Sequence, residues 1–194
     1  MDQELAQIKQ LQQKIALYED MKAYEQLYGL LYPGLHRFAC AFVKSRDTAQ
    51  DIVSDVFIKL WQIRGRLMEI ENLKVYLFTL ARNFSYNYLT QQFKKVVLSL
   101  DEADPEVLIS FDDPESLCIS ADAVGKIRLA IRQLPPQCRI IFQLVKEEGM
   151  KYKEVADVLH LSVLTVRNQV AIATRKIAAL LPAGELRAAF KNIK

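Results

Sequence analysis

The sequence predicts an all-α protein with two small helical domains joined by an acidic linker. Three observations support this fold class. The 194 residues include only 6 glycines and 6 prolines, so long stretches lack residues that break helices. Apolar residues recur at intervals of three and four, the period of an amphipathic helix. One stretch between the helical regions is acidic, contains prolines and has little apolar periodicity, which is typical of a linker.

The N-terminal part of the chain predicts two helices. Residues 1–20 place apolar side chains at nearly helical intervals among glutamines and lysines, so they predict a helix that stands alone or extends the next one. Those apolar residues are Leu5, Ile8, Leu11, Ile15 and Leu17. Residues 24–44 are rich in aromatic side chains and predict a second helix, with Pro33 and Gly34 as a candidate kink.

Two further helices complete the first predicted domain. Asp47 is the expected N-cap of a helix that runs to residue 61, because Gln50 follows it at the spacing of a capping box. One side of this helix is apolar, and its polar side carries two aspartates and a serine. Residues 62–71 lack a long apolar period and predict a loop or a broken turn. Asn72 is then the expected N-cap of a helix to residue 93.

Charge is unevenly distributed along the chain. The net charge of +3 is too small to indicate nucleic-acid binding by itself. Residues 74–95 contain four lysines or arginines and no acid, and residues 160–194 contain six against one acid. Residues 96–118 contain seven acids and no lysine or arginine. This segregation predicts two surfaces suited to phosphate, separated by a segment that avoids it, although solvated helix faces also vary in charge.

The second predicted domain begins with two helices around a proline break. Ser120 is the expected cap of a helix to residue 134, and Pro135 and Pro136 end it. The following helix is expected to end near Gly149.

The segment YKEVADVLHLSVLTVRNQV, residues 152–170, predicts a helix-turn-helix. His160 stands at the turn, where a left-handed conformation carries a cost for a residue other than glycine. The second helix of such a motif enters the major groove of DNA. The residues expected to face DNA are Ser162, Val163, Leu164, Thr165, Arg167, Asn168, Arg175 and Lys176. A simple helical hairpin would give the same apolar pattern.

Composition argues against an enzyme, a metalloprotein and a membrane protein. The three cysteines are widely spaced and fit reduced thiols, with no spacing that predicts zinc binding. Only two histidines occur, in different predicted domains, and there is no glycine-rich phosphate loop. We therefore expect no catalytic residue, no metal, no cofactor and no small-molecule substrate. Without a signal peptide or an apolar run of spanning length, the protein is expected to be cytoplasmic.

Four segments in order resemble the sigma-70 family of RNA polymerase sigma factors, in its extracytoplasmic-function (ECF) group. They are DTAQDIVSDVFIKLW (47–61), YLFTLARNFSYNYL (76–89), the proline break after Leu134 and the helix-turn-helix. The resemblance covers residues 24–181. It implies a sigma factor that binds core RNA polymerase and directs promoter-specific transcription initiation, with no catalysis of its own.

The resemblance also implies roles for individual residues. The polar face of the third helix would bind the clamp coiled coil of the polymerase's largest subunit through Asp51, Ile52, Ser54, Asp55 and Phe57. The fourth helix and the loop before it would bind the minus-ten element through Arg64, Arg66, Tyr76, Arg82, Asn83, Tyr86 and Asn87. The helix-turn-helix residues named above would bind the minus-thirty-five element. Without the resemblance, the polar face of the third helix reads as an ordinary solvated surface.

The implied organisation is a helical extension (1–23), sigma region 2 (24–95), an acidic linker (96–119), sigma region 4 (120–182) and a C-terminal tail (183–194). The partners would be core polymerase, promoter DNA and an anti-sigma factor, and the free protein would be a monomer. An alternative is a dimeric helix-turn-helix repressor or activator, which would explain only the C-terminal half. Dimerisation separates these two hypotheses, since a repressor needs two half-site readers.

Overall fold

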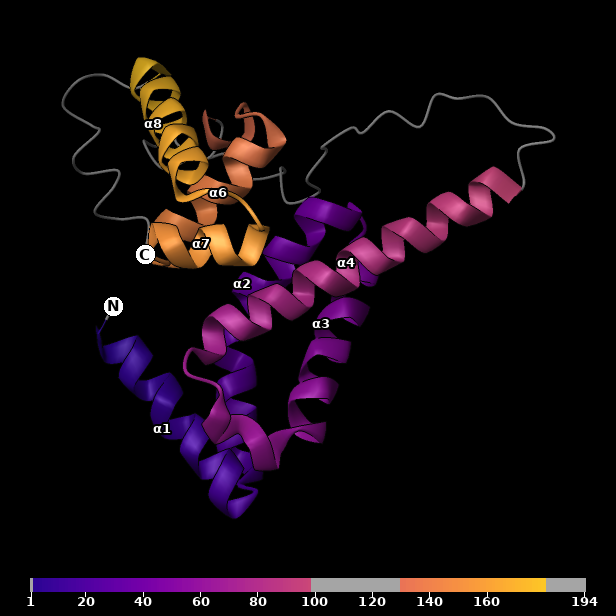
Figure 1. Ribbon diagram of the computed structural model, residues 1–194, viewed down its shortest axis with the longest axis vertical. Helices are drawn as coiled ribbons and strands as arrows, with labels where there is room; N and C mark the ends of the chain where they lie inside the picture. Colours follow the sequence, from indigo (N-terminus) through magenta and orange to yellow (C-terminus); the bar gives the residue numbers. More distant parts are fainter. Residues whose placement is uncertain (1, 99–129, 181–194) are drawn as a thin grey trace, which may run out of the picture. The chain divides into compact units, whose positions relative to one another are not determined.

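The computed structural model describes residues 2–98 and 130–180. All regular elements in these ranges are helical, which confirms the all-α prediction (Figure 1). The chain divides into two compact units, residues 1–112 and 113–194. The predicted tail, the cap at Ser120 and most of the predicted linker lie outside the described residues, although residues 96–98 belong to a helix.

The first unit opens with two helices, α1 (Asp2–Tyr18) and α2 (Met21–Val43). α1 is a separate helix that packs on α2, burying Ile8, Leu11 and Ile15 at intervals of three and four. The chain turns at Glu19, whose φ of 49° ends α1. Asp20 then caps α2, because its carboxylate accepts hydrogen bonds from the backbone N–H groups of residues 22 and 23.

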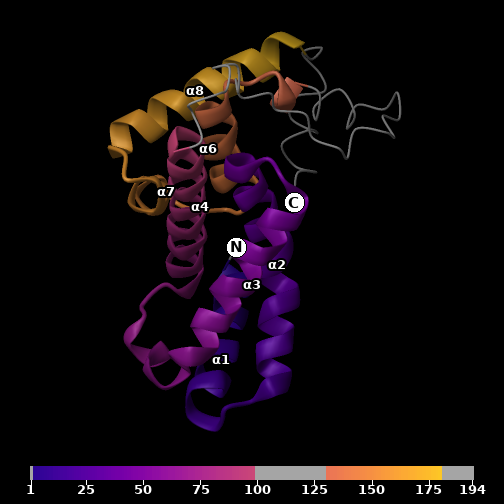
Figure 2. The ribbon, with the colours of Figure 1, turned by 90° about the vertical axis from the view of Figure 1, so that its right-hand side faces the viewer.

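α2 forms the centre of the first unit. Leu27, Leu31 and Leu35 repeat every four residues and are almost completely buried. The helix is continuous through Pro33, so the proline does not end it. α2 packs against α3 (Arg46–Gln62) and α4 (Leu73–Leu98) (Figure 2).

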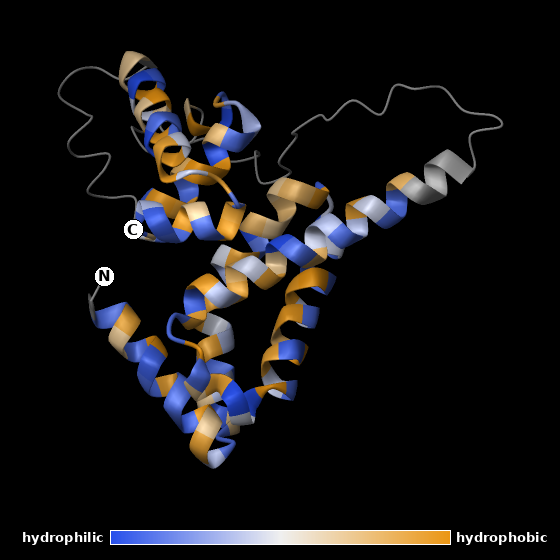
Figure 3. Cartoon of the chain, in the orientation of Figure 1, coloured by the Kyte–Doolittle hydropathy of each residue, from blue (hydrophilic) through white to orange (hydrophobic). Residues whose placement is uncertain are grey.

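The predicted N-cap of α3 was wrong by two residues. Ser45, and not Asp47, is the cap, because the Ser45 hydroxyl accepts the N–H of Thr48 at 3.3 Å. Asp47 lies in the first turn instead, where a carboxylate still stabilises the helix dipole. Hydrophobic and hydrophilic residues both occur along α3 (Figure 3), and the buried ones include Val53, Val56 and Leu60.

A short 3-10 helix, η1 (Arg64–Glu69), occupies the segment that was predicted to be a loop. The predicted cap at Asn72 is confirmed, since its side-chain oxygen accepts the N–H of Val75 at 3.1 Å. α4 then continues to residue 98, five residues beyond the predicted end. Phe78 of α4 packs edge-on against Phe38 of α2, with ring centroids 5.2 Å apart.

The second unit is built around a proline break. Residues 130–132 are helical, Pro135 has an extended backbone, and Pro136 begins α6 (Pro136–Lys146). The Arg139 guanidinium donates to the backbone carbonyls of Arg132 and Leu134, so it connects α6 to the turn before it.

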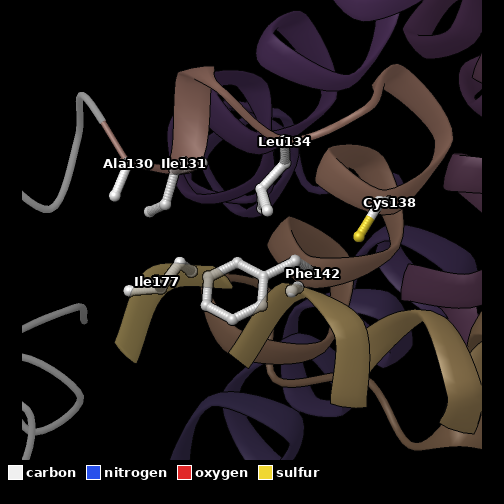
Figure 4. Close-up of a cluster of buried hydrophobic side chains, with 7 residues drawn as sticks. Ala130, Ile131, Leu134, Cys138, Phe142 and Ile177 are labelled. Atoms are coloured by element: carbon white, nitrogen blue, oxygen red, sulfur yellow. The ribbon is translucent and has the colours of Figure 1, made fainter. Parts of the chain in front are cut away.

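The core of the second unit joins α6 to α8 (Val163–Leu180) (Figure 4). Its buried members are Ala130, Ile131, Leu134, Cys138, Phe142, Ala173 and Ile177. Burial raises the pKa of the Cys138 thiol, which keeps it protonated and able to donate to the carbonyl of Gln169 at 3.3 Å. Cys138 is therefore a core residue in this unit.

α7 (Tyr152–Leu159) and α8 form the predicted helix-turn-helix, and they pack on one another. His160 joins them in a left-handed conformation with φ 54° and ψ 47°, as predicted. Ser162 begins the second helix, since its hydroxyl accepts the N–H of Thr165 at 3.0 Å. Val155 and Val166 are fully buried and hold the two helices together.

Candidate functional site

Three exposed surfaces carry the residues that the sequence singled out. The first lies on α3 and is called the α3 face: Asp51, Ser54, Asp55 and Ile58. These positions follow intervals of three and four, so they share one side of the helix. Both aspartates are exposed, and within the described residues neither has an ion-pair partner. Ser54 is half-buried and its hydroxyl donates to the Gln50 carbonyl at 2.9 Å.

Two residues predicted to belong to this face are in the core. Ile52 is 4% exposed and Phe57 is 1% exposed, so neither offers surface to a partner in this conformation. Phe57 instead packs against Tyr28 of α2, with ring centroids 4.6 Å apart, and its carbonyl accepts the Tyr24 hydroxyl. Both residues lie at the edges of the buried stripe of α3, next to the polar side of the helix, and point into the core.

Sequence reasoning missed Ile58, which is the apolar residue of the α3 face. Its side chain is 53% exposed. It stands four residues after Ser54 and seven after Asp51, so the helical period alone places it beside them. The face therefore carries two carboxylates followed, toward the C-terminal end of α3, by one exposed apolar side chain, a composition suited to a partner with basic groups beside an apolar patch.

The second surface comprises η1 and one side of α4, and is called the η1–α4 surface. On α4, Asn83, Tyr86 and Asn87 are exposed, and Tyr76 and Arg82 are half-buried. They lie opposite the buried side chains of Leu77, Phe78, Ala81 and Ser85. On η1, Arg66 and Met68 are exposed, and Met68 is a surface residue that the sequence analysis did not identify.

Aromatic and cationic groups adjoin one another on this surface. The Arg82 guanidinium lies over the Tyr86 ring, 4.6 Å from its centroid, and also donates to the Asn83 side chain at 3.2 Å. Tyr86 in turn contacts the ring of Phe42, which holds one side of it while 48% of the residue stays exposed. A half-supported ring beside a guanidinium suits the stacking of an unpaired base.

The two arginines of η1 have different environments. Arg66 is exposed and pairs with Glu69 at 2.9 Å; this hydrogen bond raises the pKa of Arg66 and lowers the pKa of Glu69. Arg64 is half-buried, with 32% of its side chain exposed: it pairs with Glu19 at 3.2 Å, donates to the Trp61 carbonyl and lies over the Trp61 ring. Arg66 is therefore the more available of the two for a phosphate.

The third surface is the exposed side of α8 and the turn before it. Val163 and Leu164 are 46% and 66% exposed at the start of the helix. Ser162, Arg167, Asn168, Arg175 and Lys176 are also exposed, and Thr165 is half-buried. The buried side of the same helix is formed by Val166, Val170, Ala173 and Ile177. All eight predicted residues therefore lie at the turn or on α8, away from the core.

No cluster of three or more His, Cys, Asp or Glu side chains in residues 2–98 and 130–180 could hold a metal ion. Among the described helices, none combines the length and apolar character that crossing a membrane requires. The geometry thus defines a helical protein of two units, the second of which carries a DNA-binding type of motif.

Comparison with known families assigns each unit. Residues 27–94 match the model of sigma-70 region 2, and residues 125–177 match that of sigma-70 region 4. The chain is 26% identical over 158 residues to the ECF RNA polymerase sigma-E factor of Escherichia coli, covering 78% of this chain and 82% of that protein. It is 24% identical over 136 residues to the RNA polymerase sigma-H factor of Pseudomonas aeruginosa, covering 66% and 70%.

Two solved structures share the fold. One is the sigma factor RpoE in complex with the anti-sigma factor NepR from Bartonella quintana, with a TM-score of 0.58 and 24% identity over 82% of this chain and 96% of that chain. The other is CnrH in complex with the cytosolic domain of CnrY, with a TM-score of 0.56 and 21% identity over 90% and 96%. The chain belongs to the sigma-70 family, in its ECF group. It is a sigma factor, a transcription initiation factor and not an enzyme.

Proposed function

We propose that this sigma factor binds core RNA polymerase through the α3 face. The observation that carries the proposal is the exposed Ile58 on the same side of α3 as two carboxylates that have no ion-pair partner in the described part of the chain. The clamp coiled coil of the largest subunit would supply basic side chains to Asp51 and Asp55 and an apolar contact to Ile58. Charge complementarity would orient the complex, and burial of Ile58 would add affinity.

The η1–α4 surface binds the minus-ten element in this proposal. Tyr86, supported by Phe42 and adjoining Arg82, is the side chain best placed to stack on an unpaired base. Asn83, three residues before it, and Asn87, directly after it, lie on the same side of α4 and carry amides that can bond base edges or phosphates. Arg66 would exchange its exposed partner Glu69 for a phosphate at little cost, because exposed ion pairs contribute little.

The exposed side of α8, with the turn before it, binds duplex DNA at the minus-thirty-five element in this proposal. Its early residues enter the major groove, where Arg167 and Asn168 would read base edges and Val163 or Leu164 would contact apolar groups. Arg175 and Lys176, further along, would contact phosphates. Residues 24–95, 96–119 and 120–182 are the proposed limits of region 2, the linker and region 4.

We also propose an anti-sigma factor as a regulatory partner. Support comes from the RpoE–NepR structure, whose sigma factor shares this fold. An inhibitor that covered the α3 face or the exposed side of α8 would block polymerase or promoter binding. The free protein would be a monomer in the cytoplasm, where polymerase acts.

Run-off transcription from genomic fragments tests the proposed function. The purified protein is added to sigma-free core polymerase from the same organism, and discrete protein-dependent start sites are expected. Their upstream sequences would share minus-ten and minus-thirty-five motifs. Absence of initiation, together with tight DNA binding by the protein alone as a dimer, would instead support a helix-turn-helix repressor or activator.

A further inference from the structure

Gln12 is a buried polar residue that joins α1 to η1. Only 6% of it is exposed. Its side-chain nitrogen donates to the carbonyl of Leu67 at 2.6 Å and to the carbonyl of Ile70 at 2.8 Å. These partners lie 55 and 58 residues away along the chain. Gln12 also precedes the segment that matches sigma-70 region 2, which begins at residue 27.

The Leu67 carbonyl belongs to η1 and also accepts the N–H of Ile70 at 3.0 Å, whereas the Ile70 carbonyl belongs to the residue that follows η1. A short 3-10 helix has few internal bonds to hold its shape, so the two contacts from Gln12 tie the end of η1 to α1. A primary amide has two N–H groups, so one glutamine can satisfy both carbonyls. Leu67 itself is fully buried, so this turn of η1 is held by its side chain and by Gln12 together.

Two ion pairs flank the Gln12 contact. Glu19, just after α1, pairs with Arg64 at the start of η1 at 3.2 Å. Glu4, near the start of α1, pairs with Lys74 at the start of α4 at 2.8 Å, and the Lys74 side chain is only 7% exposed. From Glu4 through Gln12 to Glu19, the contacted residues run backwards along the chain, from Lys74 to Arg64. α1 and residues 64–74 therefore pair in opposite chain directions, with the Gln12 contact in the middle.

We propose that Gln12 is a positioning residue for minus-ten recognition. It fixes the path of η1, so that Arg66 and Met68 are presented from one defined backbone conformation beside the start of α4. Holding the segment before DNA arrives lowers the entropy lost on binding and sharpens discrimination between sequences. This inference rests on the proposed role of the η1–α4 surface.

The test compares Gln12→Met with Gln13→Met. Methionine keeps the length and helix propensity of glutamine but has no N–H donor. Gln13 is an exposed neighbour on the same helix, so its variant is the matched control. Holoenzymes are reconstituted with each variant, and binding is measured to single-stranded oligonucleotides that carry a mapped non-template minus-ten sequence or its scrambled version.

Gln12→Met should weaken binding to the mapped oligonucleotide about tenfold, which is the loss expected for a buried hydrogen-bonded group. The affinity for the mapped oligonucleotide should then approach the affinity for the scrambled one. Gln13→Met should keep the wild-type ratio, and both variants should bind core polymerase equally. A loss of stability alone would reduce the active fraction without changing the ratio between the two oligonucleotides.

A second variant guards against misfolding of the first. Glu19→Gln removes an exposed ion pair to η1 and should reduce the same ratio to a smaller extent. If wild-type holoenzyme distinguishes the oligonucleotides and neither variant alters that ratio, the positioning role is refuted while the proposed function stands. If the wild type itself does not distinguish them, the minus-ten assignment fails.

Discussion

Ile52 and Ile58 are the same residue type on the same helix, yet they have opposite environments. Ile52 is 4% exposed and packs in the first unit, whereas Ile58 is 53% exposed on the same side of α3 as Asp51 and Asp55. Six residue steps, about 1.7 turns, separate them, so their side chains point in directions about 120° apart and one faces the core while the other faces the solvent. Burial therefore separates a structural isoleucine from one available to a partner.

The two isoleucines should respond differently to the same substitution. Ile58→Ala should weaken binding to core polymerase about tenfold, as expected for an apolar group at an interface centre, and change the unfolding free energy by less than about 0.5 kcal/mol. Ile52→Ala should lower the unfolding free energy by about 2–5 kcal/mol. Urea denaturation and a core-binding titration measure both quantities. A stability loss in Ile58→Ala as large as that in Ile52→Ala would argue against this division.

The left-handed residues of the second unit give another prediction at this scale. His160 and Gly149 have φ values of 54° and 68°, and only the glycine avoids a steric cost there. His160→Gly should therefore leave stability unchanged or raise it by up to about 1 kcal/mol, while Gly149→Ala should lower it by about 1 kcal/mol. Thermal unfolding of both variants tests these two predictions. A large destabilisation by His160→Gly would mean that the imidazole makes a stabilising contact.

At the scale of elements, periodicity predicted most of the helices and local chemistry placed some of their ends. Asn72 was identified as the N-cap of α4. At the start of α3, Ser45 and Asp47 are two residues apart and both belong to types that cap helices well, so the local sequence alone does not decide between them. Ile52 and Phe57 were assigned to a surface by resemblance, although the helical stripe itself places them with the core. The Gln12 contact depends on partners more than fifty residues away, which no local pattern encodes.

The charge of the α3 face should decide the strength of its complex with polymerase. Asp51→Lys together with Asp55→Lys reverses both carboxylates without touching the core, so folding should be retained while core binding weakens at least tenfold at low salt. Glu25→Lys, an exposed charge reversal on α2, serves as the control. Because screening weakens exposed charges, the difference should shrink as salt increases. Unchanged assembly in the double variant would return this face to an ordinary solvated surface.

At the scale of the whole molecule, the proposed function gives the two units different roles. The first carries both the acidic α3 face and the η1–α4 surface, and the second carries the basic exposed side of α8. Residues 96–118, which contain seven acids and no lysine or arginine, would in this proposal be repelled by DNA. Polymerase attachment and minus-thirty-five recognition are thus assigned to different units and should be separable by mutation.

Substitution of two residues on α8 tests that separation. Arg167→Ala with Asn168→Ala removes two exposed polar side chains from the first half of the recognition helix, and each base contact is worth about 1–3 kcal/mol of discrimination. Transcription from promoters that depend on the minus-thirty-five element should fall about 10- to 100-fold. Core binding should remain at the wild-type level, because the α3 face is untouched. Gln137→Ala, exposed near the start of α6, provides a control that should retain both activities. A parallel loss of core binding in the double variant would mean that α8 also contacts polymerase, and the division of roles between the units would have to be abandoned.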